Sequence, residues 1–194
     1  MAGEGERPPG YLCDRLLVGA TGSMAVNTVP QLLIGLRAAG LVGRVDVVMT
    51  RPATRFVTPF MMELASGNPV WTDTFQQRGS IRIPHVELTR QADLYLVIPT
   101  TASTLSKAAC GAGGDLVASA ILAAPCPVVL VPSMNEVMWC KRAVQRNVEA
   151  CREAGYHVVE PAVGYRVAAL RHEFGGMPTA PQLLSELRRV LDEG

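Results

Sequence analysis

Short aliphatic segments alternate along this chain with longer segments whose apolar residues recur at helical spacing. The aliphatic segments are predicted as strands, and they cover residues 15–20, 44–49, 94–98, 128–131 and 156–159. The helical spacing covers residues 25–38, 105–109, 115–124, 137–154 and 180–191. Because strands that alternate with helices form parallel β-α-β units, the pattern predicts an α/β fold. The expected form is a Rossmann-like, doubly wound, mostly parallel sheet flanked by helices.

The less regular parts of the chain lie at its start and near its end. Residues 1–12 are rich in Gly, Glu and Pro and are interpreted as a disordered tail, so residues 13–194 form a single predicted domain. Residues 161–179 show no regular periodicity and contain several Gly and Pro residues, which favours a mobile flap over a site. Pro30 fits only near a first helical turn, so the helix within residues 25–38 is predicted to start late.

Hydroxyl side chains follow three of the predicted strands. Thr21 and Ser23 stand in the Gly-rich turn 19–23, Thr50 follows the second strand, and four hydroxyls lie within residues 100–104. Ser and Thr are ordinary helix caps, but beside a helix N-terminus they also bind anions. The carboxyl ends of parallel strands share one edge of a sheet, where open α/β sheets bind ligands. Three such ends therefore favour a phosphate or nucleotide site over capping alone, although the G-x-G-x-x-G dinucleotide spacing is absent.

Composition excludes several kinds of partner. The formal net charge of +1 gives no electrostatic reason to expect a nucleic-acid or membrane partner. No apolar run approaches the ~20 residues that span a bilayer, and the first ten residues lack the apolar core of a signal peptide. The five cysteines are scattered without metal-binding spacing, so no metal site is predicted. Reduced thiols in a cytoplasmic protein are the simplest interpretation.

Two side chains are candidates for chemistry. His85 precedes the strand that leads to the hydroxyl-rich turn, and a neutral imidazole near pH 7 can act as a base. A single histidine is more often structural, and the local sequence leaves both roles open. Asn135 follows the strand at residues 128–131, and its amide can both donate and accept hydrogen bonds.

Two motifs resemble those of a known family. The segments are Pro99-Thr100-Thr101-Ala102-Ser103-Thr104 and Pro132-Ser133-Met134-Asn135-Glu136-Val137-Met138-Trp139. They resemble the P-A-S/T-A-N-T turn and the P-x-M-N-x-x-M-W segment of the homo-oligomeric flavin-containing cysteine decarboxylases. The second motif is the more specific, and the resemblance extends from about Leu16 to about Leu191. Ser103 departs from the family motif, which has Asn at that position.

The resemblance implies a Rossmann-like flavoprotein fold and a role for each matching residue. It implies FMN, with FAD as the alternative, bound between the subunits of a trimer, and a dodecamer built from trimers. His85 matches the catalytic base, while Met134 and the catalytic Asn135 match the part that holds the substrate carboxylate. In the flap, Gly164, Tyr165 and Arg166 match substrate-binding positions. The cofactor-binding rim is matched by Gly19, Thr21, Gly22, Ser23, Thr50, Pro99, Thr100, Thr101, Ala102, Ser103 and Thr104.

The flap separates two branches of the family. The coenzyme A branch, phosphopantothenoylcysteine decarboxylase, carries a cysteine there, whereas this sequence reads Val167-Ala168-Ala169-Leu170-Arg171 and has no cysteine after Cys151. The chain therefore looks like a peptidyl-cysteine decarboxylase of the lanthipeptide or thioamitide type. Such an enzyme oxidatively decarboxylates the C-terminal cysteine of a ribosomally made precursor peptide, giving an aminoenethiolate, CO₂ and reduced flavin. The alternatives are phosphopantothenoylcysteine decarboxylase and a non-catalytic flavin-binding regulatory subunit.

Overall fold

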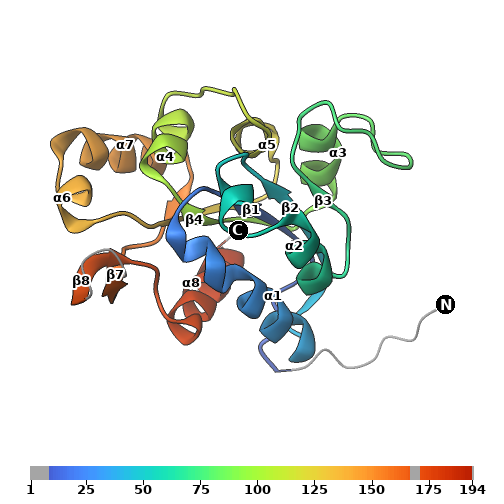
Figure 1. Ribbon diagram of the computed structural model, residues 1–194, viewed down its shortest axis with the longest axis horizontal. Helices are drawn as coiled ribbons and strands as arrows, with labels where there is room; N and C mark the ends of the chain where they lie inside the picture. The colour runs from blue at the N-terminus through green and yellow to red at the C-terminus, as the bar shows by residue number, and fades with distance from the viewer. Residues whose placement is uncertain (1–8, 167–170, 194) are drawn as a thin grey trace.

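Six parallel strands form the central sheet of the computed structural model, which describes residues 9–166 and 171–193 (Figure 1). Residues 1–8 of the expected tail, residues 167–170 of the expected flap and Gly194 lie outside the described residues. The elements are β1 Cys13–Ala20, the 3-10 helix η1 Met24–Thr28, α1 Val29–Ala38, β2 Val42–Met49, the 3-10 helix η2 Ala53–Arg55, α2 Pro59–Ser66, β3 Val70–Trp71, α3 Pro84–Gln91, β4 Leu94–Thr100, α4 Ala102–Ala109, α5 Leu116–Ala123, β5 Val128–Pro132, α6 Glu136–Trp139, α7 Arg142–Glu153, β6 His157–Val158, β7 Ala162–Arg166, β8 Arg171–Gly176 and α8 Ala180–Glu193.

The strand order of the sheet is β3-β2-β1-β4-β5-β6. This order confirms the predicted α/β fold with a parallel sheet flanked by helices. The chain winds outward from β1 to β3 and then returns to place β4 on the other side of β1. The order of winding reverses between β1 and β4, and doubly wound sheets bind ligands outside the carboxyl ends of the strands at such a point.

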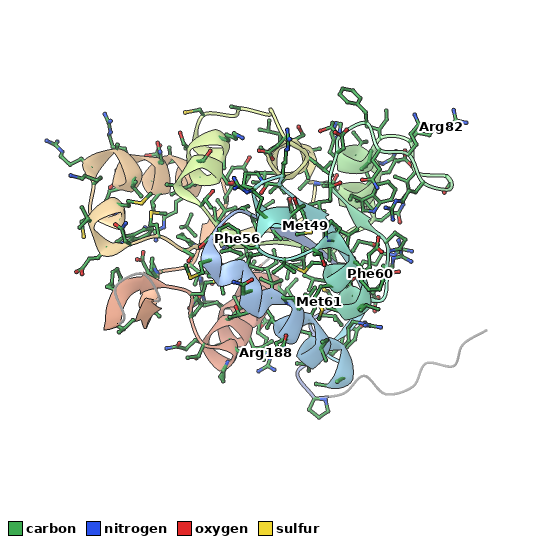
Figure 2. The ribbon with its side chains drawn as sticks, viewed as in Figure 1. Met49, Phe56, Phe60, Met61, Arg82 and Arg188 are labelled. Carbon is green, nitrogen blue, oxygen red and sulfur yellow. The ribbon has the colours of Figure 1, made fainter. Side chains whose placement is uncertain are left out.

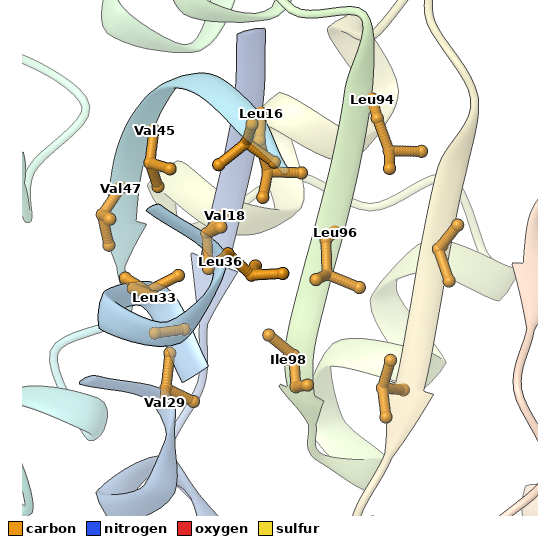
Figure 3. Close-up of a cluster of buried hydrophobic side chains, with 14 of the residues drawn as sticks. Leu16, Val18, Val29, Leu33, Leu36, Val45, Val47, Leu94, Leu96 and Ile98 are labelled. Atoms are coloured by element: carbon orange, nitrogen blue, oxygen red, sulfur yellow. The ribbon is translucent and has the colours of Figure 1, made fainter. Parts of the chain in front are cut away.

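Side chains on successive strand residues enter two separate hydrophobic cores. Leu16 and Val18 of β1 lie in one core with α1, α2 and α8, whereas the intervening Leu17 lies in the other with α3, α4, α5 and α7. Strand β4 divides in the same way, with Leu96 in the first core and Val97 in the second. Figure 3 shows part of the first core, where β-strand side chains meet those of α1. Burial on both faces explains why these strands carry continuous apolar runs.

Four boundaries before residue 103 show how local chemistry sets the elements. Helix α1 begins at Val29 with Pro30 in its first turn, as predicted. Leu12 is buried and donates its backbone N–H to the Leu41 carbonyl, so the packed chain begins before β1. Strand β4 continues through Pro99 to Thr100, beyond the predicted end at Ile98. Helix α4 then starts at Ala102 rather than near Leu105, because the Thr101 side chain caps its first turn.

Helix is confirmed over most of residues 137–154, but the predicted single helix is interrupted, because the chain forms two helices there. Asn135 caps the short helix α6, which ends at Trp139, and Lys141 adopts an extended conformation before α7 begins. The side-chain amide of Gln145 donates to the Trp139 carbonyl at 2.6 Å, which stabilises the break. Periodicity alone did not reveal this interruption, because apolar residues on both helices pack against the same core.

The segment expected to form an irregular flap contains an antiparallel strand pair, β7 and β8. Their register pairs Ala162 with Gly176 and Tyr165 with His172. The pair lies outside the six-stranded sheet, so its sequence lacks the continuous apolar runs of the buried sheet strands. Its base is anchored by the Met134 N–H, which donates to the Gly175 carbonyl at 3.1 Å. Among the described helices, none combines the length and apolarity needed to cross a membrane.

Candidate active site

Thr21 connects the carboxyl ends of β1 and β4, the two strands between which the winding reverses. Its hydroxyl donates to the Pro99 carbonyl at 2.6 Å and accepts the Thr101 N–H at 3.0 Å. The bond to the Pro99 carbonyl is buried and the bond from Thr101 is partly buried, and Thr21 itself is almost completely buried. The predicted rim residues of the first loop and of the 99–104 turn are therefore in direct contact.

Ser133 adds a fourth strand end to the rim. Its hydroxyl lies 3.1 Å from the Ser23 hydroxyl, and its N–H donates to the Thr100 carbonyl at 3.0 Å. Ser133 was not among the site residues predicted from the sequence. The signal was present, because Ser133 follows β5 directly as Thr50 follows β2. Through Ser133 the Gly-rich loop contacts the segment that carries Asn135.

Close packing explains two glycines of the predicted rim. A Cβ atom on Gly19 would lie 2.7 Å from the Tyr95 hydroxyl oxygen, and one on Gly22 would lie 2.4 Å from the Pro52 Cβ. Tyr95 is fully buried and donates its hydroxyl to the Val117 carbonyl at 3.2 Å. Burial raises the pKa of Tyr95 well above its usual value, so this hydroxyl stays protonated. The two glycines thus let neighbouring elements approach closely, whatever else binds at the rim.

The hydroxyls of the 99–104 turn have different environments. Thr100 is fully buried, and its hydroxyl stabilises the sheet. It donates to the Val97 carbonyl at 2.8 Å and accepts the Val131 N–H of β5 at 3.1 Å. The Thr101 hydroxyl caps α4 by accepting the Thr104 N–H at 3.3 Å, and it lies 3.1 Å from the Thr104 hydroxyl. Ser103 is exposed, and its side chain has no hydrogen bond within the described chain.

The rim retains polar groups that fit a flavin and its phosphate. The Thr50 hydroxyl is buried without a hydrogen-bond partner among the described residues, and Thr50 adjoins the end of β1 through its N–H bond to the Ala20 carbonyl. Helix α4 points its first N–H groups, those of Ala102 and Ser103, out of its N-terminus, where no intrahelical acceptor exists. An anionic ligand at this edge would meet donors from three neighbouring loops. The donor set therefore fits a phosphate-bearing cofactor.

Met134 and Asn135 follow Ser133 at the same edge of the sheet. The Asn135 carbonyl oxygen Oδ1 accepts the Met138 N–H at 2.8 Å and so caps α6. This bond orients the side chain and leaves its amide N–H₂ group available to a ligand. Met134 is buried, and its backbone holds the base of β8. The predicted carboxylate-binding position is thus exposed and held in orientation.

His85 lies in the first turn of α3, apart from Asn135. Its Nδ1 atom is buried without a hydrogen-bond partner in the described chain, while the ring as a whole is half-buried. Figure 1 shows α3 and α6 at opposite ends of the helical layer above the sheet, and Figure 2 shows Arg82, in the loop before α3, at the same far end. A single chain therefore does not bring His85 and Asn135 together.

Gly164, Tyr165 and Arg166, the predicted substrate-binding residues of the flap, lie in β7. Their partners in β8 are Glu173, His172 and Arg171. The flap is thus a strand pair whose base is hydrogen-bonded to the segment that carries Met134 and Asn135.

The fold and the rim define an α/β protein built to bind a phosphate-bearing cofactor at the carboxyl edge of a parallel sheet. Comparison with known proteins agrees, since the Flavoprotein family matches residues 11–192. The crystal structure of the FMN-dependent cysteine decarboxylase SpaF is 36% identical, with a TM-score of 0.79 over 93% of this chain and 96% of that one. TvaF, an FMN-dependent cysteine decarboxylase from thioviridamide biosynthesis, is 37% identical, with a TM-score of 0.70 over 76% of this chain and 90% of that one.

A curated relative comes from coenzyme A biosynthesis. The bifunctional protein CoaBC of Mycobacterium tuberculosis is 36% identical over 178 residues, which make up 92% of this chain but 41% of the relative. This chain thus spans about two fifths of the length of that relative. The chain belongs to the flavoprotein family, within the homo-oligomeric flavin-containing cysteine decarboxylases. The resemblance seen in the two sequence motifs is confirmed.

Proposed function

We propose that this chain is a peptidyl-cysteine decarboxylase that acts on the C-terminal cysteine of a ribosomally made precursor peptide. The products are an aminoenethiolate, CO₂ and reduced flavin, and the cofactor is FMN. The observation that carries the proposal is the flap, which contains no cysteine, in a chain that has both family motifs. The similarity to SpaF and TvaF over most of the chain supports this assignment, and both are described as FMN-dependent.

Asn135 is proposed to bind the substrate carboxylate. Its Oδ1 atom caps α6, and this bond leaves both amide hydrogens of the side chain available to a ligand. A carboxylate is the natural acceptor for such a donor, and this contact would orient the C-terminal cysteine at the rim. Thr50 and Ser103, with the N-terminus of α4, would hold the cofactor phosphate and ribityl hydroxyls.

His85 is proposed to take a proton from the substrate cysteine. When bound, the flavin would supply the oxidation by accepting two electrons from the cysteine. The resulting C=S group can draw electrons from the bond to the adjacent carboxylate, which then leaves as CO₂. The protein promotes this loss by positioning the carboxylate through Asn135 and by covering the site with the β7–β8 pair, which excludes water.

The complete site is proposed to form between copies of the chain in a trimer, with trimers assembled into a dodecamer. A second copy could bring its own α3, with His85, to the rim that carries Asn135. An apolar surface that suits self-association lies on the face of the sheet that carries α2, the face opposite α3. Helix α2 and its approach expose Phe56, Phe60 and Leu64, and Figure 2 shows Phe56 and Phe60 there. Beside them lies a cavity of about 310 Å³ lined by Pro30, Phe56 and Met61.

Phosphopantothenoylcysteine decarboxylase is the second candidate. The observation in its favour is the 36% identity to a CoaBC protein of coenzyme A biosynthesis over most of this chain. Both substrates present a carboxylate beside a thiol, so Asn135 would serve either one. They differ in what precedes the cysteine, which is a peptide in one case and a phosphopantothenoyl group in the other.

Mass spectrometry of reaction products separates these candidates. The purified protein with bound flavin is incubated with peptides ending in cysteine and, in parallel, with phosphopantothenoylcysteine. The proposed function predicts that the peptides lose about 46 Da, the mass of CO₂ and two hydrogen atoms. A loss seen only with phosphopantothenoylcysteine would establish the second candidate. Bound flavin with no loss from either substrate would support a non-catalytic flavin-binding subunit.

A further inference from the structure

A groove of about 920 Å³ runs along the open edge of the central sheet, away from the residues assigned to chemistry. One wall is a continuous stretch of chain, residues 155–163, which includes the edge strand β6 and the start of β7. The other wall is the N-terminal half of α8, where Gln182 and Ser185 face the groove. The groove thus separates a sheet edge from a helix.

The β6 wall can recognise an extended peptide through its backbone. Strand β6 pairs with β5 on one side and has no strand on its other side within the described residues. An edge strand presents N–H and C=O groups that can pair with an added strand. One such group, the Val158 carbonyl, accepts a long 3.4 Å bond from Arg152.

The charges in the groove argue against a simple anion or cation site. Arg152 forms an ion pair with Glu160, and Arg189 forms ion pairs with Glu186 at 2.9 Å and with Glu193 at 2.9 Å. Both guanidinium groups are therefore neutralised by carboxylates of the same chain. Without an excess of either charge, shape and backbone hydrogen bonds remain to select an occupant, which suits a polypeptide better than a phosphate.

The β7–β8 pair connects this groove to the candidate active site. Ala162 lines the groove and pairs with Gly176, and the neighbouring Gly175 accepts the Met134 N–H. Two steps of about 5 Å each, the spacing of paired strands, therefore separate the groove from Met134. An extended peptide advances about 3.3 Å per residue, so three to four residues cover that distance.

We propose that the groove binds the segment of the precursor peptide that lies about four or more residues before its C-terminal cysteine. The segment would lie extended against the edge of β6, and the cysteine would lie at Asn135. This inference rests on the proposed function and extends it to a second, sequence-tolerant binding site. Such a site would raise the affinity for full precursors over short peptides while leaving the chemistry at the rim unchanged.

The test is the dependence of kcat/KM on peptide length. Peptides of three to ten residues share the same C-terminal tripeptide, and we expect kcat/KM to rise about tenfold once the length exceeds about five residues. Ser185→Trp fills the groove and should remove this rise while tripeptide turnover stays unchanged. Asp192→Trp is the matched control, since it lies two turns further along α8, outside the groove lining, and should keep the rise. N-methylation of peptide amides in the upstream segment should also remove the rise, because it blocks strand pairing.

Three results would overturn the proposal. They are a kcat/KM independent of length, a length effect that survives Ser185→Trp, and a change in oligomer mass caused by Ser185→Trp in light scattering. The last result would assign the groove to contacts between copies of the chain. Binding of a labelled ten-residue peptide that ends in alanine, measured by fluorescence anisotropy, tests the groove even if no peptide is decarboxylated. This binding measurement therefore distinguishes a wrong assignment of the enzymatic function from a wrong assignment of the groove as a peptide-binding site.

Discussion

The Thr101 N–H donates to the Thr21 hydroxyl at 3.0 Å and so joins two loops that are 80 residues apart in the chain. The same hydroxyl donates to the Pro99 carbonyl, and thus Thr21 holds both sides of the Pro99–Thr101 turn. Because Thr101 caps α4, this contact also sets where the N-terminus of that helix points. The cofactor rim is therefore assembled by buried hydroxyls, while the groups left free at its surface are available to a ligand.

Replacement of His85 tests its proposed role as a base. His85→Asn is expected to retain flavin, because His85 lies outside the rim loops, and to lower turnover at least about 100-fold through loss of the proton acceptor. Flavin content is measured by absorbance and turnover by mass spectrometry of a cysteine-terminal peptide. Near-normal turnover in this variant would contradict the assignment.

Asn135→Asp separates capping from substrate binding. Asp caps helices as well as Asn does, so α6 should persist and thermal unfolding should be unchanged. The amide donor is replaced by a negative charge, and kcat/KM should fall about 100-fold as the substrate carboxylate is repelled. The neighbouring exposed Glu136→Gln serves as the control and should keep full activity. An Asn135→Asp variant as active as the control would exclude a carboxylate contact at this position.

Mixed oligomers test whether the site is shared between chains. His85→Asn and Asn135→Asp subunits, each inactive alone, are co-expressed with different affinity tags and purified through both. If His85 and Asn135 of different copies meet, random pairing should restore activity at about one quarter of the sites. If each site draws both residues from one chain, the mixed oligomer stays inactive.

Thr50→Val tests the unpartnered hydroxyl at the rim. A buried hydroxyl without a partner is destabilising, so its removal should raise the free energy of unfolding of the flavin-free protein by about 1 kcal/mol. Flavin affinity should fall about tenfold, because the hydroxyl is expected to bind the cofactor. Denaturant unfolding and flavin titration measure the two effects separately.

The matched control for that experiment is Thr100→Val. Its hydroxyl already bonds to the Val97 carbonyl and the Val131 N–H, so its loss should destabilise the flavin-free protein by about 1–3 kcal/mol. If Thr50→Val raises the free energy of unfolding and Thr100→Val lowers it, the result would support a role for the Thr50 hydroxyl in ligand binding. A loss of stability in both would instead indicate that the Thr50 hydroxyl is satisfied within the fold.

The sequence alone determined the order of β1, β2, β4, β5 and β6, the parallel α/β class and the family. Strands such as β1 and β4 are buried on both faces, and this burial leaves a strong local signal in the chain. The two motifs could be recognised in the sequence because the chemistry of a rim residue lies in its side chain, which the sequence specifies directly. The break between α6 and α7 was missed because a single side-chain hydrogen bond, from Gln145 to the Trp139 carbonyl, leaves no mark on the apolar periodicity. The β7–β8 pair was missed because its base is held by a contact with Met134, far away in the chain.

Tertiary structure decided which of the rim hydroxyls are free. Thr50, Thr100 and Ser103 look alike in the sequence. In the structure the first is buried with no hydrogen-bond partner among the described residues, the second is bonded within the sheet and the third is exposed. It also placed α3, which carries His85, and α6, which Asn135 caps, at opposite ends of the same helical layer, and no spacing in the sequence reveals this separation. The sequence specifies the type of each side chain directly. Its burial and its hydrogen-bond partners depend on elements that pack against it from elsewhere in the chain.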